Sequence, residues 1–387
     1  MRVAHIITRM IIGGAQENTL LCSLDLMQDH GDDVLLVTGP SLGPEGDLLS
    51  QGRAGDLPVK RIESLRRAIH PWHDLRAYRD LRRALREFQP DVVHTHSAKA
   101  GFLGRSAAWT ERIPAVVHTV HGAPFHSYQG RAARTVYRLC ERYAARRCHA
   151  LISVADAMTE RLVAARVAPP EMFATIYSGM QLEPFLTARE QRDAARRELG
   201  YSEQDFVIGK LARLFKLKGH EYVIAAARQV LDQVPQARFL FIGDGVLRAN
   251  CERQIRRAGL RDYFRFTGLV PPEQIPRHLA ALDTLVHASL REGLARCLPQ
   301  ALLAGVPVIS FDIDGACEVV VHEQTGLLVP PPDVARLAQA MVRLAGDAAS
   351  RQRMAEAGRE RCRGMFCHHE MTRQIRGVYA RVLAGRR

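Results

Sequence analysis

The sequence has few lysines, few aromatic residues and no long apolar run. Aromatic residues make up 6% of the 387 positions. No stretch approaches the ~18 uninterrupted apolar residues that a membrane-spanning helix needs. The eight cysteines show no paired spacing, so we interpret them as small buried residues of a reducing compartment. With 47% hydrophobic and 25% charged residues, a wholly disordered chain is excluded, and the length indicates two domains.

The first residues also lack the pattern of a secretory signal. Arg9 interrupts a short apolar run, and no small-residue cleavage site follows a long hydrophobic region. We therefore expect a cytoplasmic protein, at most peripheral on the inner face of the cytoplasmic membrane.

Positive charge is in excess and unevenly distributed. Lys and Arg total 54 against 41 Asp and Glu, a net charge of +13, and only five of the 54 are lysines. Residues 53–86 carry ten basic and four acidic side chains, and residues 131–147 carry six and one. In both segments arginines recur at helical spacing beside apolar residues. Two interpretations stay open: solvated outer faces of core helices, or an anionic membrane surface bound through 66–86 and 131–147.

Nucleic-acid binding is a third use for the positive charge, and we disfavour it. The basic segments lack interleaved stacking residues, and no known nucleic-acid-binding motif is present. We therefore expect no nucleic-acid partner.

Short apolar runs alternate with longer segments of 3.6-residue periodicity, such as 74–88 and 221–234. Runs such as DVLLVT and ARFLFI are apolar on both faces, as parallel strands covered by helices should be. Predicted strands of the first half are 2–7, 33–38, 58–62, 91–95, 115–120, 150–154 and 174–177. Those of the second half are 206–211, 237–242, 263–267, 284–287, 306–310 and 326–329.

The strand–helix pattern starts a second time after a charged segment at 187–200. It predicts an α/β protein of two Rossmann-like, doubly wound parallel-sheet domains facing a central cleft. We place these domains at 1–185 and 186–367, with a C-terminal helix at about 368–387 that returns to the first. Ligands of such sheets bind beyond the carboxyl ends of strands, so the loops that follow strands are the informative places.

Paired glycines, Gly13 and Gly14, follow the first predicted strand and precede Gln16. Glycines before a helix let backbone N–H groups approach an anion or a sugar closely. A plain tight turn explains the pair about as well. The G-x-G-x-x-G fingerprint of dinucleotide-binding proteins is absent.

Two further loops that follow strands are rich in histidine, HTHSAKAGFLGR and HTVHGAPFH. His94 and His118 stand where strand residues are buried, and we expect them in the core. His96 and His121 come at or after strand ends, where an imidazole can contact substrate hydroxyls. No carboxylate or thiolate completes a recognisable zinc site, and the cysteines and histidines at 362–369 fit no zinc spacing. We predict no metal.

In the second half, Arg213 follows a predicted strand and Lys218 precedes the glycine that opens the next helix. Two cations beside a helix N-terminus form a diphosphate site, because the helix dipole and the free N–H groups add to their charge. Solvated loop cations are the alternative, but three of the five lysines fall within nine residues here. Glu292 lies in a later loop, where a carboxylate can hold vicinal hydroxyls. The Asp-x-Asp at 312–314 is a weaker candidate for a metal site.

Taken in order, these loops resemble those of the family 4 glycosyltransferases, retaining enzymes of the two-domain GT-B architecture. The resemblance covers nearly the whole chain, and its motifs are weak singly but specific jointly. Within the family, the chain most resembles transferases that build bacterial cell-surface or exopolysaccharide glycans. The motifs are GGAQ, HTHSAKAGFLGR, HTVHG, YSGM, GKLARLFKLKGH, FIGDG, FTGLV, REGLARCLPQALLAGVPVIS and TGLLVPP.

The resemblance implies roles for individual residues. Arg213 and Lys218 match the pair that binds the donor diphosphate, Glu292 matches the acid that contacts donor-sugar hydroxyls, and His121 matches the histidine near the anomeric centre. Further donor-binding positions are Gly13, Gly14, Gly243, Asp244, Gly245, Val270, Gly293, Leu294 and Gln300. Acceptor-side candidates are Gln16, His96 and Lys99.

One position departs from the family pattern. The second acid of the Glu-x7-Glu motif, which in the family holds the ribose hydroxyls, is Gln300 here. A neutral amide can still contact a ribose, but without charge assistance. The departure bears on nucleotide binding more than on the type of reaction.

The resemblance implies transfer of a hexosyl group, with its anomeric configuration kept, from a nucleoside-diphosphate sugar to a hydroxyl of a glycan or lipid-linked acceptor. UDP is the expected nucleotide, GDP is the alternative, and no cofactor is required. A sugar-nucleotide epimerase of the same architecture is a second hypothesis, and it would turn over the donor without an acceptor.

Overall fold

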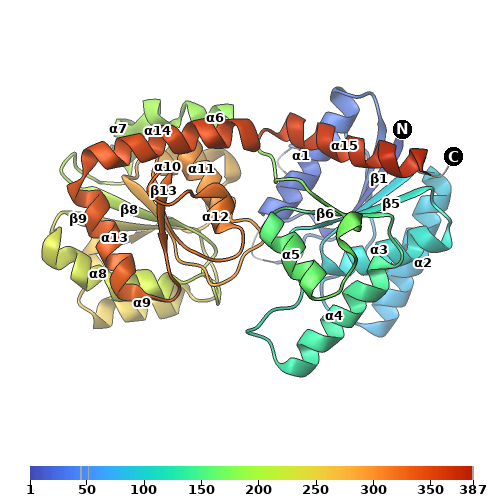
Figure 1. Cartoon of the computed structure of the whole chain (residues 1–387), viewed down its shortest axis with the longest axis horizontal. Coiled ribbons are helices and arrows are strands. Elements are labelled where there is room, and N and C mark those ends of the chain that lie inside the picture. Colours follow the sequence, from blue (N-terminus) through green and yellow to red (C-terminus); the bar gives the residue numbers. More distant parts are fainter. Residues whose placement is uncertain (44–45, 51, 386–387) are drawn as a thin grey trace. The chain divides into compact units, whose positions relative to one another are not determined.

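The computed structural model describes residues 1–43, 46–50 and 52–385, which fold into two compact units (Figure 1). The first unit comprises Met1–Met180 and Cys367–Arg387, and the second comprises Gln181–Phe366. Residues 386 and 387, at the end of the predicted C-terminal helix, lie outside the described residues. Among the described residues, no helix combines the length and apolarity needed to span a bilayer.

The first unit is built on a seven-stranded parallel sheet in the order β3-β2-β1-β4-β5-β6-β7. All seven predicted strands are confirmed, with ends within two residues. The strands are β1 (Arg2–Arg9), β2 (Asp33–Gly39), β3 (Val59–Arg61), β4 (Val92–His96), β5 (Ala115–Val120), β6 (Ala150–Ser153) and β7 (Phe173–Thr175). The strand order reverses between β1 and β4, which is where ligands of doubly wound sheets bind.

Helices connect these strands and return the end of the chain to the first unit. They are α1 (Gly14–Gln28), α2 (Pro71–Phe88), α3 (Ala98–Thr110), α4 (Arg131–Ala145), α5 (Asp156–Ala164), the 3₁₀ turn η1 (Pro170–Met172) and the final helix α15 (His368–Ala384). The start of α2 follows local rules, since Pro71 occupies its first turn and the His70 side chain accepts a hydrogen bond from His73 N.

The second unit is built on a six-stranded parallel sheet in the order β10-β9-β8-β11-β12-β13. All six predicted strands are again confirmed within two residues. They are β8 (Phe206–Leu211), β9 (Ala237–Ile242), β10 (Phe264–Phe266), β11 (Thr284–His287), β12 (Val308–Phe311) and β13 (Gly326–Val329). The order reverses between β8 and β11.

The helices of the second unit include α8, which matches the periodicity predicted at 221–234, and α11, which has Pro299 in its first turn as predicted. The α-helices are α6 (Glu183–Leu186), α7 (Arg192–Glu198), α8 (His220–Gln233), α9 (Arg248–Arg257), α10 (Ile275–Ala280), α11 (Cys297–Leu303), α12 (Ala316–Val319), α13 (Val334–Gly346) and α14 (Ala348–Met365). The 3₁₀ turns are η2 (Ala188–Gln191), η3 (Arg261–Tyr263) and η4 (Pro272–Gln274).

Helix α15 completes the core of the first unit. Met371, Ile375 and Tyr379 are buried and join the cluster formed by β1, β2 and α1. The Tyr379 hydroxyl lies 2.6 Å from Nδ1 of His94 in β4. Figure 1 shows α15, at the red end of the chain, beside α1. Residues nearly 300 positions apart therefore build one core.

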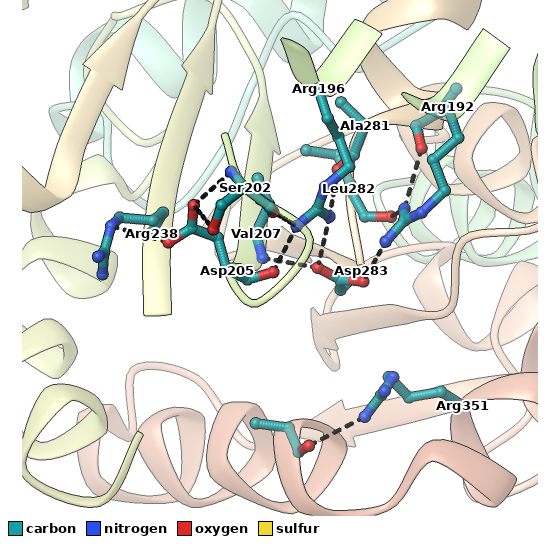
Figure 2. A network of polar contacts seen from close by, with 12 residues as sticks. Arg192, Arg196, Ser202, Asp205, Val207, Arg238, Ala281, Leu282, Asp283 and Arg351 are labelled. Atoms are coloured by element: carbon teal, nitrogen blue, oxygen red, sulfur yellow. Dashed lines mark hydrogen bonds and ion pairs between the residues drawn. The ribbon is translucent and has the colours of Figure 1, made fainter. Parts of the chain in front are cut away.

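A polar network anchors the amino ends of β8 and β11 (Figure 2). Asp283 accepts hydrogen bonds from Arg192 at 2.6 Å, from Arg196 at 3.1 Å and from the backbone N–H of Val207 at 2.7 Å. The Arg196 and Asp283 side chains are only 6% and 12% exposed. The network lies at the strand edge opposite the carboxyl ends, so it supports the sheet without entering a ligand site.

We predict that Asp283→Ala lowers the free energy of unfolding of the second unit by about 3 kcal/mol, because it leaves nearly buried arginine charge unpaired. Chemical denaturation measures the change. The control is Glu323→Ala, which removes one partner of the exposed Glu323–Arg343 pair and should barely shift the midpoint. Equal midpoints for the two variants would contradict the assignment.

Candidate functional site

Loops that follow β8, β9 and β11 interlock at the carboxyl edge of the second sheet. The Leu290 N–H donates to Leu217 O at 2.8 Å, and the Leu214 N–H donates to Asp244 O at 2.9 Å. These backbone hydrogen bonds hold the loop after β8 against both neighbouring loops. Side chains from three separate sequence motifs are thereby fixed in one region.

Two glycines allow this close approach of the backbones. Gly219 has φ +70°, and a Cβ there would lie 1.8 Å from Ala288 O in the loop after β11. Gly243 has φ +129°, and its Cβ would lie 2.4 Å from Ala212 O. Any other residue would clash with the backbone at both positions. Gly219 also precedes the first residue of α8, so Lys218 stands directly before the N-terminus of that helix.

Lys218 and Glu292 form an ion pair between the loops after β8 and β11. Lys218 Nζ lies 2.6 Å from Glu292 Oε1, and the two side chains are 22% and 19% exposed. His287 Nε2 lies 3.4 Å from the same oxygen, and the Glu292 N–H donates to Asp314 Oδ2 at 2.6 Å. Burial opposes ionisation of Glu292, but the Lys218 charge and the His287 contact outweigh it and hold the pKa of Glu292 well below its ordinary value.

A second lysine lies beneath this pair. Lys210, in β8, is 1% exposed, and its ammonium has no hydrogen-bond partner among the described residues. The pKa of Lys210 is lowered to about 8, chiefly by burial and with a smaller contribution from the charge of Lys218, while Cys297 and Glu292 act in the opposite direction. Lys210 is one of the three lysines clustered within nine residues, and the sequence pattern assigns it no role. The available signal was a lysine inside an otherwise apolar predicted strand.

The other predicted donor-binding residues of this unit lie in the same set of loops and on α11. Arg213 is exposed after β8, with its guanidinium 5.1 Å from the centre of the Phe215 ring. Gly293 and Leu294 are buried directly after Glu292, and Gln300 is partly exposed on α11. The remaining four are Gly243, Asp244 and Gly245 after β9 and Val270, 7% exposed, after β10.

Asp314 is a direct neighbour of Glu292 that the sequence does not reveal. In the sequence, the Asp-x-Asp at 312–314 is only a weak candidate for a metal site. In the structure, the Asp314 carboxylate accepts the Glu292 N–H and so orients the loop that carries Glu292. The contact spans 22 residues, which no local pattern reveals.

In the first unit, the histidines after β4 and β5 divide into buried and accessible rings. His94 and His118 are buried, as predicted. His96, which we predicted to contact the acceptor, is fully buried, because β4 extends through it and the ring lies inside the unit. His121, the first residue after β5, is partly exposed. Direct contact with a ligand is therefore open to His121 and closed to His96 in this structure.

Three buried histidines lie close enough to be considered as metal ligands. One ring nitrogen each from His5, His94 and His96 lies within 4.8 Å of the others. Both nitrogens of His94 are already engaged, however, by the Tyr379 hydroxyl and by Thr119 Oγ1 at 2.7 Å. Hydrogen bonding accounts for the positions of these rings.

A second cluster of this kind joins α1 to α15. It consists of Asp25, His368 and His369, and His368 Nδ1 lies 2.9 Å from both Asp25 oxygens. Thr372 also donates to Asp25 at 2.7 Å. These contacts hold α1 against α15 in the first unit. They give a structural role to His368 and His369, the two histidines of the segment at 362–369.

The remaining first-unit candidates lie near the start of α1 and α3. Gly13 caps α1 and Gly14 is its first residue. The Gln16 amide nitrogen donates to Arg9 O at 3.3 Å. Lys99 is held by the Asp74 carboxylate and by Ala68 O, both outside the histidine cluster, so an acceptor would have to compete with Asp74 for it.

Comparison with known proteins gives the family. Residues 18–179 match the model described as "Glycosyl transferase 4-like domain", and residues 191–361 match "Glycosyl transferases group 1". The Escherichia coli UDP-Gal:alpha-D-GlcNAc-diphosphoundecaprenol alpha-1,3-galactosyltransferase is 30% identical over 90% of this chain and 88% of its own length. The 2-deoxystreptamine glucosyltransferase of Streptomyces kanamyceticus is 29% identical, over 78% of this chain and 80% of its own.

Solved structures give the same fold. Anabaena Alr3699/HepE, crystallised with UDP and glucose, superposes with a TM-score of 0.84 over 98% of this chain and 99% of its own, at 23% identity. Sucrose-phosphate synthase from Thermosynechococcus elongatus superposes with a TM-score of 0.82 over all of both chains, at 20% identity. Two parallel-sheet units with these loops, both family models and a 30% identical relative all agree: this chain belongs to the family 4 glycosyltransferases of GT-B architecture.

Proposed function

We propose that this glycosyltransferase moves a hexosyl group from a UDP-sugar to a hydroxyl of a glycan or lipid-linked acceptor, with retention of anomeric configuration, in bacterial surface-polysaccharide synthesis. The observation that carries the proposal is the Lys218–Glu292 pair at the N-terminus of α8. It supplies a cation for a diphosphate and a carboxylate for sugar hydroxyls side by side.

The diphosphate part of the donor would bind to the cations. Lys218 and Arg213 belong to the loop before α8, and the first-turn N–H groups and the positive end of the dipole of this 14-residue helix point toward the same loop. These charges stabilise the negative charge that develops on the leaving diphosphate, and they do so without a metal ion.

Glu292 would hold the sugar. Its lowered pKa keeps it ionised at neutral pH, so it can accept two hydrogen bonds from vicinal hydroxyls. Because Lys218 and Glu292 each satisfy the other in the unliganded protein, the donor would exchange one ion pair for a phosphate contact and a hydroxyl contact. Gln300 would contact the ribose without charge assistance.

The relatives support the choice of substrates. The name of the Escherichia coli relative specifies UDP-Gal as donor and a diphosphoundecaprenol-linked acceptor, and Alr3699/HepE has been crystallised with UDP and glucose. We extend both features to this chain, with a GDP-sugar as the alternative donor. Retention would follow from departure of the diphosphate and attack of the acceptor on the same face of the sugar.

A donor and acceptor screen tests this proposal. UDP- and GDP-sugars are incubated with and without diphospholipid-linked sugar acceptors, and nucleotide release and the anomeric configuration of the product are measured by NMR. Acceptor-dependent release of UDP with retention supports the proposal. Interconversion of the donor sugar without acceptor would instead indicate an epimerase, and an inverted product would contradict retention.

We predict that Lys218→Ala lowers kcat/KM by roughly 10²-fold or more, the scale of losing one preorganised charge stabiliser. The matched control is Lys216→Ala, which removes an exposed lysine from the same loop and should leave kcat/KM near that of the wild type. Steady-state kinetics with saturating acceptor gives both values. Similar values for the two variants would refute the role of Lys218.

The outer face of α4 gives a separate reason to propose a membrane partner. Val136, Leu139 and Tyr143 are 56%, 52% and 45% exposed. The only acid of the helix, Glu141, is buried and pairs with Arg105 at 3.0 Å. Among the described residues, none forms an ion pair with the four arginines of this helix, which are Arg131, Arg134, Arg138 and Arg142.

The basic residues of α2 differ from those of α4. Arg82 and Arg86 pair with Glu111, and Arg83 pairs with Asp80 at 2.9 Å. Much of the positive charge of 66–86 is thus compensated within the first unit. We therefore assign peripheral binding at the inner face of an anionic membrane chiefly to α4, with its apolar residues entering the headgroup region.

We predict that the double variant Arg134→Glu/Arg138→Glu weakens binding to phosphatidylglycerol vesicles by at least about 2 kcal/mol, or roughly 30-fold, because each removed surface cation contributes about 1 kcal/mol. Co-sedimentation measures the binding. The control Arg256→Glu/Arg257→Glu makes the same charge change at exposed positions of α9 in the second unit and should bind nearly as the wild type does. No dependence of wild-type binding on anionic lipid would rule the proposal out.

A further inference from the structure

Three histidines from separate segments form an unbroken hydrogen-bonded chain in the first unit. His5 Nδ1 lies 3.0 Å from His96 Nε2, and His96 Nδ1 lies 3.1 Å from His121 Nε2. The three residues come together because β1 pairs with β4 and β4 pairs with β5. His5 and His96 are fully buried, and the chain reaches partly exposed positions at His121.

Burial keeps the interior members of this chain neutral. It lowers the pKa of His5 to about 3, and burial together with the charges of neighbouring histidines, His94 foremost, lowers the pKa of His96 well below its ordinary value. A neutral imidazole has one N–H and one lone pair. Each N···N contact needs one donor and one acceptor, so both hydrogen bonds must point in the same direction along the chain.

The far end of the chain selects that direction. His5 Nε2 is buried and has no hydrogen-bond partner among the described residues. The neighbouring ring of His94 offers it none, because the two nitrogens of His94 are engaged by Tyr379 and Thr119. If the chain pointed inward, His5 Nε2 would carry an orphaned buried N–H. If it points outward, His5 Nε2 keeps only a lone pair, and buried unpaired acceptors are better tolerated than buried unpaired N–H groups.

We propose that His5 and His96 are positioning residues that fix His121 as its Nδ1–H tautomer, so that His121 donates a hydrogen bond to the donor substrate and does not act as a base. The chain then runs from His5 Nδ1–H to His96 Nε2 and from His96 Nδ1–H to His121 Nε2. The claim about the substrate rests on the proposed function, in which His121 contacts the donor sugar.

This tautomer has a consequence for proton transfer in the reaction. With Nε2 accepting from His96 and Nδ1 carrying its hydrogen, neutral His121 has no lone pair to receive the acceptor's proton. The bond between the anomeric carbon and the diphosphate oxygen breaks, its electron pair stays on the diphosphate, and the acceptor oxygen bonds to that carbon. The hydroxyl proton then passes to the diphosphate oxygen.

Two-bond ¹H–¹⁵N correlation spectra of the whole protein, labelled with ¹⁵N-histidine, test the tautomer directly. His121→Gln assigns the His121 signals by their loss. We expect His121 to be protonated at Nδ1 and unprotonated at Nε2. Protonation at Nε2 overturns the proposal, and so does stoichiometric zinc in the purified protein, because a metal would occupy the ring nitrogens.

Variants of two adjacent buried histidines separate positioning from stability. His96→Phe removes the N–H group that donates to His121 Nε2, so we expect the Nδ1–H signature of His121 to be lost. We also expect kcat to fall about tenfold, with little change in the KM for the nucleotide-sugar substrate. His94→Phe removes an equally buried ring of β4 outside the chain and should keep the signature. His96→Asn, which can still donate to His121, should restore much of the kcat. Equal losses of kcat in the two Phe variants, with the signature kept in both, overturn the proposal.

The claim about the His121 tautomer and the claim that His121 contacts the donor substrate can be disproved independently. Wild-type turnover in His121→Ala would contradict the proposed contact with the donor sugar and overturn the functional half of the inference, whatever the spectra show. Loss of turnover in that variant, together with a wild type in which His121 is protonated at Nε2, would keep the proposed function. It would overturn the proposal that His5 and His96 fix His121 as its Nδ1–H tautomer.

Discussion

The ion pair between Lys218 and Glu292 is the interaction on which the proposed chemistry of the second unit depends. Burial alone would favour a protonated, neutral Glu292, and the lysine reverses that preference. The pair forms only because the loop after β8 approaches the loop after β11 at Gly219, where no side chain fits. Its two members are still about one-fifth exposed, as the proposed exchange of the pair for contacts with a donor substrate requires.

The first unit places a different kind of polar group at the equivalent edge of its sheet. Cations line the loops of the second unit, whereas the loops after β4 and β5 carry imidazoles that burial keeps neutral. A neutral imidazole contributes no net charge to the edge of the first sheet. Its contribution is directional, since it presents either a donor or an acceptor, and the hydrogen-bonded chain from His5 decides which one. The positive charge of α4 serves neither purpose, because it faces solvent.

Much of this could be predicted from the sequence. The apolar runs predicted all thirteen strands, because strand patterns are local. Arg213, Lys218 and Gly219 before α8 were equally visible in the sequence, and the diphosphate site predicted from them stays a prediction. Contacts between distant segments could not be predicted in this way. The His5–His96 contact spans 91 residues, and the Tyr379–His94 contact spans 285. His96 is buried because β4 ends at residue 96, one residue beyond the predicted strand end at 95. The periodicity of apolar residues does not define a strand end to within one residue. The arginines of 66–86 and 131–147 have the same helical spacing in the sequence. Only the structure shows that several arginines of α2 pair with carboxylates and that those of α4 do not.

The central claim is that Lys218 and Glu292 form a donor site and not merely a structural ion pair. The charge-swapped variant Lys218→Glu/Glu292→Lys separates these alternatives, because it retains the possibility of a pair while reversing the charge beside α8. Isothermal titration with UDP and UDP-sugars, alongside thermal unfolding, is the direct measurement. We expect the swapped variant to have an unfolding midpoint near that of the wild type and no measurable binding of the donor. Wild-type affinity for the donor in the swapped variant would contradict it.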